Sequence, residues 1–155
     1  MFRKMRRFKQ QLTGEECAEI LRRERRGVLA LLGDGGYPYA LPLDFVYEDG
    51  KIYFHCAAEG HKIDAIRRCD KASFCVTERG DAVPGEWWLT VRSVIAFGRV
   101  RILDDRKEVL SRVRALGMKY APPEYVEKEI QKDGKRVQCL EFTVEHMTGK
   151  RVNER

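Results

Sequence analysis

The segment from Trp87 to Leu103 constrains the fold most, because it reads as one strand of unusual length. The residues that share one face are first Val91, Ser93, Ile95 and Phe97. After them the apolar residues Val100 and Ile102 fall on the opposite face. Gly98 stands at the change, which is where a bulge or a sharp bend is expected. A strand bent in this way can serve two parts of a closed sheet.

Five further stretches have the composition of strands and are separated by turn signals. They cover residues 27–33, 37–48, 51–56, 71–78 and 138–149. Pro42 cannot donate a ladder hydrogen bond, so its strand is expected at an edge or opening, and Asp49-Gly50 predicts a hairpin. In the last stretch we expect one face to point inward and the other to face water. The inward residues are Leu140, Phe142, Val144 and His146, and the outward residues are Glu141, Thr143 and Glu145.

Helices are predicted between these strands. Thr13 and Glu16 form a capping-box pattern at the start of the first helix, which Gly27 is expected to end. Asp104 is expected to cap a later helix, and "APPEY" breaks it before a short charged helix. The sum is mainly β with helices, an α+β fold, and a small β-barrel is favoured over a βαβ sheet.

Length and charge limit the classes of protein. With 155 residues, 43% of them hydrophobic, the chain is expected to form a single domain over residues 1–155, in which residues 1–11 are a basic arm. The net charge is +6, but thirty Lys and Arg are mixed with twenty-four Asp and Glu. This mixing argues against nucleic-acid binding.

The location is expected to be cytoplasmic. No stretch approaches the ~20 apolar residues of a membrane span, and the Arg-rich start lacks the apolar core of a secretory signal. The five cysteines are scattered and never spaced C-x-x-C, so they are interpreted as reduced thiols. His55, Cys56 and His61 do not form a metal pattern, because adjacent strand residues point to opposite faces.

The stretch "YFHCAAEGHKIDAIRRC" contains the candidate site. Gly60, His61 and Lys62 lie where a helix begins, and its first amides and its dipole favour an anion. A lysine ammonium and an imidazole at this place describe a phosphate site. The alternative is a surface helix whose first turn happens to be basic.

Three stretches together resemble the pyridoxamine 5′-phosphate oxidase-like FMN-binding split barrels, and among them the nitroimidazole-resistance branch. They are "GVLALLGDGGYPYALPLDFVYEDGKIYFHCAAEGHKIDAI", "RSVIAFGRVRIL" and "EHMTGK". The resemblance also includes the opening "MFRKMRR" and the order of the strands. It implies a split β-barrel that forms a homodimer and holds FMN between its subunits.

The resemblance also implies a set of cofactor-binding residues. The backbone of Pro42, Leu43, Asp44 and Phe45 is expected to border the flavin ring. Leu43 to Phe45 are favoured there, because Pro42 has no N–H to donate. Gly60, His61 and Lys62 are expected to hold the phosphate, with Arg92 and Ser93 as further candidates. Arg92 and Ser93 point to opposite faces of their strand, so both are not expected to touch one phosphate. His146 is interpreted as a core histidine, and Trp87 and Trp88 as packing or dimer surface.

The resemblance implies an FMN-dependent oxidoreductase that reduces a nitroaromatic or a similar small acceptor. No strand–GxGxxG–helix unit is present, so a nicotinamide reductant is expected to visit the flavin and leave. His61 is the candidate proton donor, because imidazole titrates near neutrality. The alternative is a flavin- or haem-binding storage or sensor protein without catalysis, with His61 or His146 as a haem ligand.

Overall fold

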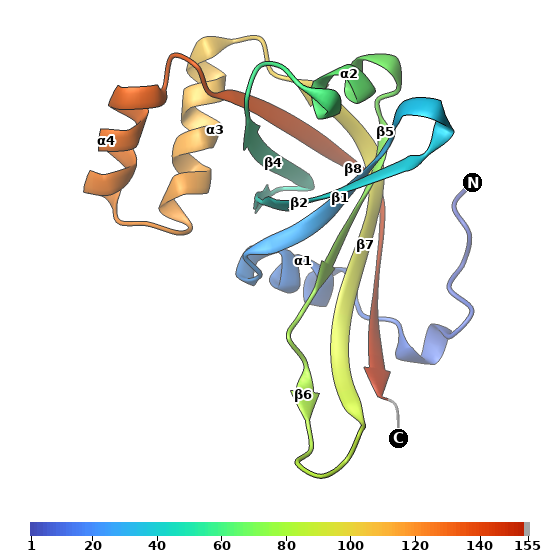
Figure 1. The fold of residues 1–155 in the computed structure, drawn as a ribbon. Helices are drawn as coiled ribbons and strands as arrows, with labels where there is room; N and C mark the ends of the chain where they lie inside the picture. Colours follow the sequence, from blue (N-terminus) through green and yellow to red (C-terminus); the bar gives the residue numbers. More distant parts are fainter. Residues whose placement is uncertain (154–155) are drawn as a thin grey trace.

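The computed structural model describes residues 1–153, which form one curled antiparallel sheet with α-helices packed around it (Figure 1). The strands are β1 (Arg26–Leu32), β2 (Pro38–Asp44), β3 (Val46–Glu48), β4 (Lys51–Cys56), β5 (Lys71–Thr77), β6 (Asp81–Ala82), β7 (Leu89–Ile102) and β8 (Gln138–Asn153). The helices are α1 (Gly14–Arg23), α2 (His61–Arg68), α3 (Arg106–Met118) and α4 (Pro123–Asp133).

The sheet closes on itself through the chain. Its strand order is β2-β1-β5-β7-β8-β4-β3, and β6 adds a short pairing to β7. The two edge strands, β2 and β3, are consecutive in the sequence and are separated by the single residue Phe45. The curled sheet is therefore a split β-barrel, as the sequence predicts, and β2 lies at an edge as Pro42 requires.

Apolar side chains from both the sheet and α1 fill the barrel. Phe74 on β5 lies edge-on to Phe45 and Phe54, with ring centroids 4.9 and 5.0 Å away. Ile20 and Leu21 of α1 are fully buried in the same cluster, so α1 covers one opening of the barrel. The interior has no room for a cofactor, and any flavin must lie outside it.

The predicted starts of two helices are confirmed, and two other predicted helix boundaries are wrong. Thr13 and Glu16 make the capping box of α1, and Gly60 is the N-cap of α2. The cap of α3 is Asp105 and not Asp104, because the Asp105 side chain accepts hydrogen bonds from the amides of Lys107 and Glu108. Gly27 does not end α1 but lies inside β1, where an added Cβ would be 2.3 Å from the Phe74 ring.

The irregularity at Gly98 is confirmed, but the extra residue belongs to β8. Phe97 pairs with His146 and Gly98 pairs with Val144, which leaves Glu145 without a partner in β7. Along β7 the inner face does not change, and it runs through Val94, Ala96, Gly98 and Val100. The expected switch of faces in β7 is therefore wrong, since the bulge lies in the neighbouring strand.

This bulge moves His146 to the outer face. Its ring stacks on Phe2 of the N-terminal arm at 4.7 Å and lies near Phe97, which is 39% exposed. The prediction that His146 points into the core is therefore wrong. At the bulge, two successive residues of β8 lie opposite one position of β7. The alternation of inward and outward side chains along β8 therefore restarts after Glu145, and Met147 packs against the core.

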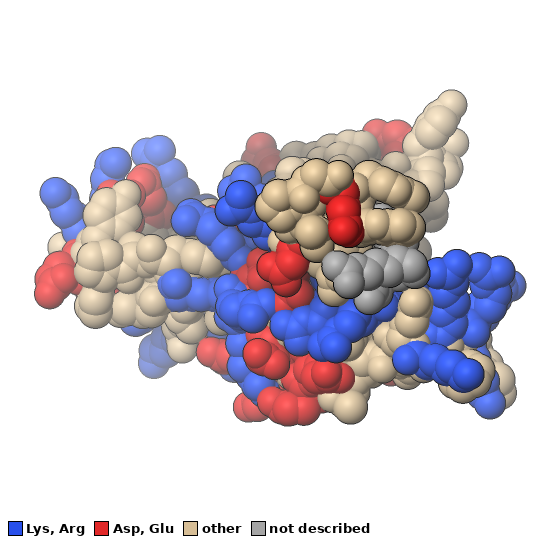
Figure 2. All heavy atoms as spheres, turned by 90° about the horizontal axis from the view of Figure 1, so that it is seen from below, with Lys and Arg blue, Asp and Glu red and all other residues tan. Residues whose placement is uncertain are grey.

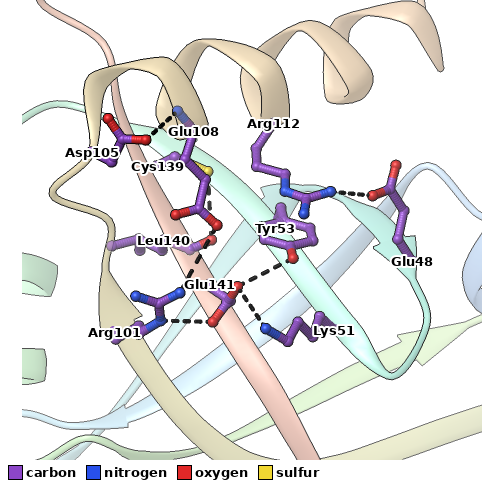
Figure 3. A network of polar contacts seen from close by, with 10 residues as sticks. All are labelled: Glu48, Lys51, Tyr53, Arg101, Asp105, Glu108, Arg112, Cys139, Leu140 and Glu141. Carbon is purple, nitrogen blue, oxygen red and sulfur yellow. Dashed lines mark hydrogen bonds and ion pairs between the residues drawn. The ribbon is translucent and has the colours of Figure 1, made fainter.

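Glu141 is the second correction in β8, because its side chain is 2% exposed and does not face water. Figure 3 shows its carboxylate accepting hydrogen bonds from Arg101 (2.7 Å), Lys51 (3.0 Å) and Tyr53 (3.2 Å). Burial raises the pKa of this carboxyl, but the hydrogen bonds from Arg101 and Lys51 outweigh burial and hold the pKa below its usual value. A paired carboxylate beneath α3 thus replaces the expected solvent contact.

Charge is mixed over the surface. Seen from below, Lys and Arg side chains lie among Asp and Glu over the centre of the molecule (Figure 2). Within residues 1–153, no helix combines the length and the apolar character needed to cross a membrane. The same residues bring no three metal-ligating side chains together.

Candidate functional site

The start of α2 presents unbonded amides next to a lysine. The amides of Ile63 and Asp64 already donate to the carbonyl of Gly60, so the amides of His61 and Lys62 precede the first helical hydrogen bond. Gly60 has φ of 121°, a conformation that glycine adopts readily and other residues rarely do. A glycine is thus required where the chain turns into the helix.

Lys62 is half-buried and has no carboxylate partner among residues 1–153. A partly buried ammonium without a counter-ion is costly, because desolvation is not offset by pairing. Its charge does lower the pKa of the nearby Cys56 thiol, although burial raises that pKa more. Lys62 and the two amides together fit an anionic group such as a phosphate.

His61 ties this helix start to the edge strand. Its ring stacks on Tyr39 of β2 with centroids 4.1 Å apart, and its Nε2 lies 3.6 Å from the Asp34 carboxylate. Arg68 pairs with the same carboxylate at 2.6 Å, and its hydrogen bond and charge lower the pKa of Asp34 below its usual value. The imidazole is therefore held beside the first residues of β2 and remains 41% exposed.

The segment expected to border a flavin ring lies at the other end of β2. Tyr39 and Asp44 are five residues apart, which is about 17 Å along a strand. Pro42 is exposed, the Leu43 side chain packs against the core, and Asp44 pairs with Arg26 at 2.7 Å. Of Leu43 and Asp44, one directs its N–H toward β1 and the other toward the open edge.

Phe45 differs from this expectation because its amide is not free. It lies at the gap between β2 and β3, and its N–H donates to the Tyr120 hydroxyl at 3.1 Å. The Nζ of Lys119 donates to the Phe45 carbonyl at 3.1 Å and to the Glu24 carbonyl at 2.6 Å. Two residues just beyond α3 therefore satisfy the backbone at the point where the sheet has no ladder.

Neither Lys119 nor Tyr120 is among the site residues predicted from the sequence. The Tyr120 hydroxyl also donates to the Arg25 carbonyl at 2.7 Å, so it joins the ends of β1 and β2. Burial disfavours the charged form of both side chains, so it lowers the pKa of Lys119 to about 8 and raises the pKa of Tyr120. No local signal marks either residue, since their partners are 74 to 98 residues away in the sequence.

Arg92 and Ser93 lie on opposite faces of β7, as predicted. Arg92 makes two hydrogen bonds to Glu78, at 2.6 and 2.9 Å, beside an open cavity of about 620 Å³. Ser93 pairs with Thr77 and with Lys150 on the outer face. The structure does not bring either residue to the start of α2 in the same chain, because Ser93 lies toward the Asp44 end of β2.

The outer face of β1, β5 and β7 carries apolar side chains in cross-strand register. Val28 pairs with Cys75 and Cys75 with Ile95, and Val28 and Ile95 are 40% and 42% exposed. The β6–β7 hairpin extends away from the barrel and ends near stacked Trp87 and Trp88, with Trp87 77% exposed (Figure 1). The outer face is therefore an apolar surface beside the edge strand.

The fold is a split barrel, because the sheet curls until its two edge strands are joined by the single residue Phe45. The cationic start of α2 lies against one of these edge strands, β2. The sequence profile of the pyridoxamine 5′-phosphate oxidase family matches residues 13–151. The chain belongs to this family, which confirms the resemblance seen in the sequence. No curated protein matches the chain in sequence.

Solved structures share the fold at low identity. A candidate 5-nitroimidazole antibiotic resistance protein from Bacteroides thetaiotaomicron has a TM-score of 0.78 and 19% identity, over 92% of this chain and 87% of that one. A conserved hypothetical protein from Mycobacterium tuberculosis has a TM-score of 0.81 and 19% identity, over 95% and 90%. An FAD- and haem-binding protein from Mycobacterium smegmatis has a TM-score of 0.75 and 18% identity, over 94% and 74%.

Proposed function

We propose that the protein is an FMN-dependent oxidoreductase that reduces a nitroaromatic or similar small acceptor. The observation that carries the proposal is the half-buried Lys62, which has no carboxylate partner within residues 1–153 and lies at a helix start that His61 fixes against the edge strand. Known structures with this fold include proteins described as binding FAD, or FAD and haem. We favour FMN as the flavin because Lys62 and the two amides at the start of α2 fit one terminal phosphate.

Different residues of the site bind the phosphate and orient the flavin ring. Lys62 and the amides of His61 and Lys62 bind the phosphate, and the backbone of Leu43 and Asp44 orients the ring edge from β2. When bound, FMN supplies a hydride acceptor and donor at its ring nitrogen. His61 is held by Tyr39 and Asp34 at the phosphate end of β2, about 17 Å along the strand from Asp44, so it holds a proton for the acceptor across the groove of a dimer and not within its own chain. Arg92 is already bonded to Glu78, so its guanidinium is less available to a phosphate than the Lys62 ammonium.

We further propose a homodimer that forms through the outer apolar face, with the flavin in the groove between subunits. Val28, Ile95 and Phe97 form a contiguous exposed surface, which a lone barrel would leave in water. Light scattering is expected to give twice the chain mass, and Ile95→Lys is expected to shift the protein toward monomer. A flavin-loaded parent that remains a monomer would contradict the dimer.

The test of the function is an anaerobic absorption experiment on the purified, FMN-loaded protein. A reduced nicotinamide is expected to bleach the oxidised flavin band, because no dinucleotide-binding unit is needed for a visiting reductant. A nitroaromatic or a quinone is then expected to restore the band. If neither step changes the spectrum, the protein does not carry out this reaction.

A second candidate is a flavin- or haem-binding carrier or sensor, which the FAD- and haem-binding structure with this fold favours. His146 is covered by Phe2, so His61 would be the more accessible haem ligand. The spectrum of the protein as purified separates the two, because haem and flavin bands differ. The cysteines are free thiols, which fits the cytoplasmic location that we propose.

A further inference from the structure

A cavity of about 540 Å³ lies between the α3–α4 pair and the rim of the barrel. The two helices stand to one side of the sheet (Figure 1), and α3 packs against β4 and β8. The volume is within the range of pockets that bind small molecules. None of the residues proposed for the flavin phosphate lines it.

The walls of the cavity are mainly apolar. They come from α3, the turn that follows it, α4 and the segment before β8, and include Val113, Leu116, Tyr120, Val126, Ile130 and Val137. The helices approach closely at Gly117, where an added Cβ would be 2.8 Å from Val126. A flat apolar molecule suits such walls, because it removes apolar area from water without needing many polar partners.

The charged groups of the lining disfavour an anion. Arg25 is the one arginine or lysine that lines the cavity among the described residues, and it is already engaged. Its guanidinium lies 4.9 Å from the centre of the Tyr120 ring and 3.4 Å from the Asp44 carboxylate. Glu129 and Asp133 add two carboxylates from α4, and Glu129 has no ion-pair partner within residues 1–153.

The cavity adjoins the segment that we assign to the flavin ring. Asp44 lines it, and Tyr120 lines it while its hydroxyl bonds to the backbone of Phe45. A molecule in the cavity therefore lies beside the end of β2. His55, on the outer face of β4, provides a further polar group in the lining.

We propose that this cavity is the acceptor site, and that it takes flat aromatic molecules that are neutral or cationic and excludes anionic ones. The assignment as an acceptor site rests on the proposed function. The charge preference follows from the cavity itself. A phosphorylated pyridoxine is then a poor ligand, since the only lining guanidinium is shared between Asp44 and Tyr120.

The test uses three probes of matched shape: 4-nitrobenzylamine, 4-nitrobenzyl alcohol and 4-nitrobenzoate. Binding to the FMN-loaded, oxidised protein is measured by calorimetry, and the KM of each probe is measured in flavin reoxidation. The amine and the alcohol are expected to bind at least about tenfold more tightly than the benzoate, the scale of one near-surface charge interaction. Equal binding of all three would overturn the proposal.

Two variants locate the binding. Ala121→Trp fills the cavity and is expected to raise the KM of the amine and the alcohol about tenfold or more, while reduction by nicotinamide is unchanged. Glu129→Lys is expected to favour the benzoate over the amine, and this test remains if Ala121→Trp does not fold. Lys128→Trp and Glu124→Lys are matched controls on exposed parts of α4 outside the lining, and both are expected to behave as the parent.

The outcomes separate this proposal from the proposed function. If the parent reduces the probes and both cavity variants match it, the cavity is not the acceptor site although the function stands. If the flavin is never reduced but the amine binds and Ala121→Trp abolishes that binding, the charge-selective cavity stands and the oxidoreductase does not. Binding of the amine that neither variant alters overturns the cavity proposal.

Discussion

Replacing Gly98 with alanine is expected to lower the free energy of unfolding by about 3 kcal/mol or more, the upper end of the cost of overpacking a well-packed site. An added Cβ would be 1.9 Å from the Thr143 carbonyl oxygen and 2.9 Å from its carbon. Both atoms belong to the backbone of β8, so no side-chain rotation relieves the contact. The strands must separate or the bulge must move.

Urea denaturation followed by circular dichroism measures this loss. Gly14→Ala is the matched control, because an added Cβ there meets nothing within 4 Å and Gly14 begins α1. The control is expected to be neutral or slightly stabilising, since alanine favours helix. An unfolding free energy of Gly98→Ala equal to that of the parent would show that the close approach of β7 to β8 is not required.

Lys62→Ala is expected to weaken FMN binding about 10- to 150-fold, which corresponds to roughly 1.5–3 kcal/mol for a hydrogen bond to a charged group. Riboflavin binding should change little, because riboflavin lacks the phosphate. The half-buried Lys62 has no carboxylate partner within residues 1–153, so its removal breaks no ion pair of the protein. The loss is therefore a direct measure of the phosphate contact.

Flavin fluorescence quenching provides both affinities. Arg67→Ala is the matched control, because it removes the same charge from the last turn of the same helix, where Arg67 is exposed and lies near Asp64. It is expected to leave FMN affinity close to that of the parent. Equal losses for FMN and riboflavin in Lys62→Ala would count against the phosphate site, and so would FMN binding like that of the parent.

His61→Ala extends this comparison to the chemistry. If His61 holds a proton for the acceptor, this variant binds FMN nearly as the parent does, and flavin reoxidation slows. If His61 serves only the phosphate, FMN affinity falls and riboflavin affinity does not. The stack on Tyr39 and the contact with Asp34 favour the first result, because both groups orient the imidazole.

The start of the candidate site was predictable from the sequence, and its surroundings were not. Gly60 to Lys62 form a helix start as predicted, because the glycine and the amphipathic spacing act within a few residues. The surroundings depend on distant partners. The Arg92 guanidinium is bonded to Glu78, 14 residues away, and the Phe45 amide is bonded to Tyr120, 75 residues away. Spacing along one strand carries no information about such partners.

The sequence by itself determined the local elements. Thr13 caps α1, Asp49 and Gly50 turn the β3–β4 hairpin with φ of 45° and 80°, and Pro42 keeps β2 at an edge. These effects depend on the dihedral angles and hydrogen bonds of neighbouring residues.

The tertiary structure alone decided where the strands meet and which side chains they cover. It placed Gly27 inside β1 against Phe74, assigned the bulge to Glu145 of β8, and buried Glu141 among Lys51, Tyr53 and Arg101. Alternation within a strand fixes two faces but does not say which one a distant helix will cover. The cavity between the α3–α4 pair and the barrel rim has the same origin, since its lining comes from residues between Arg25 and Val137 that only the folded chain brings together.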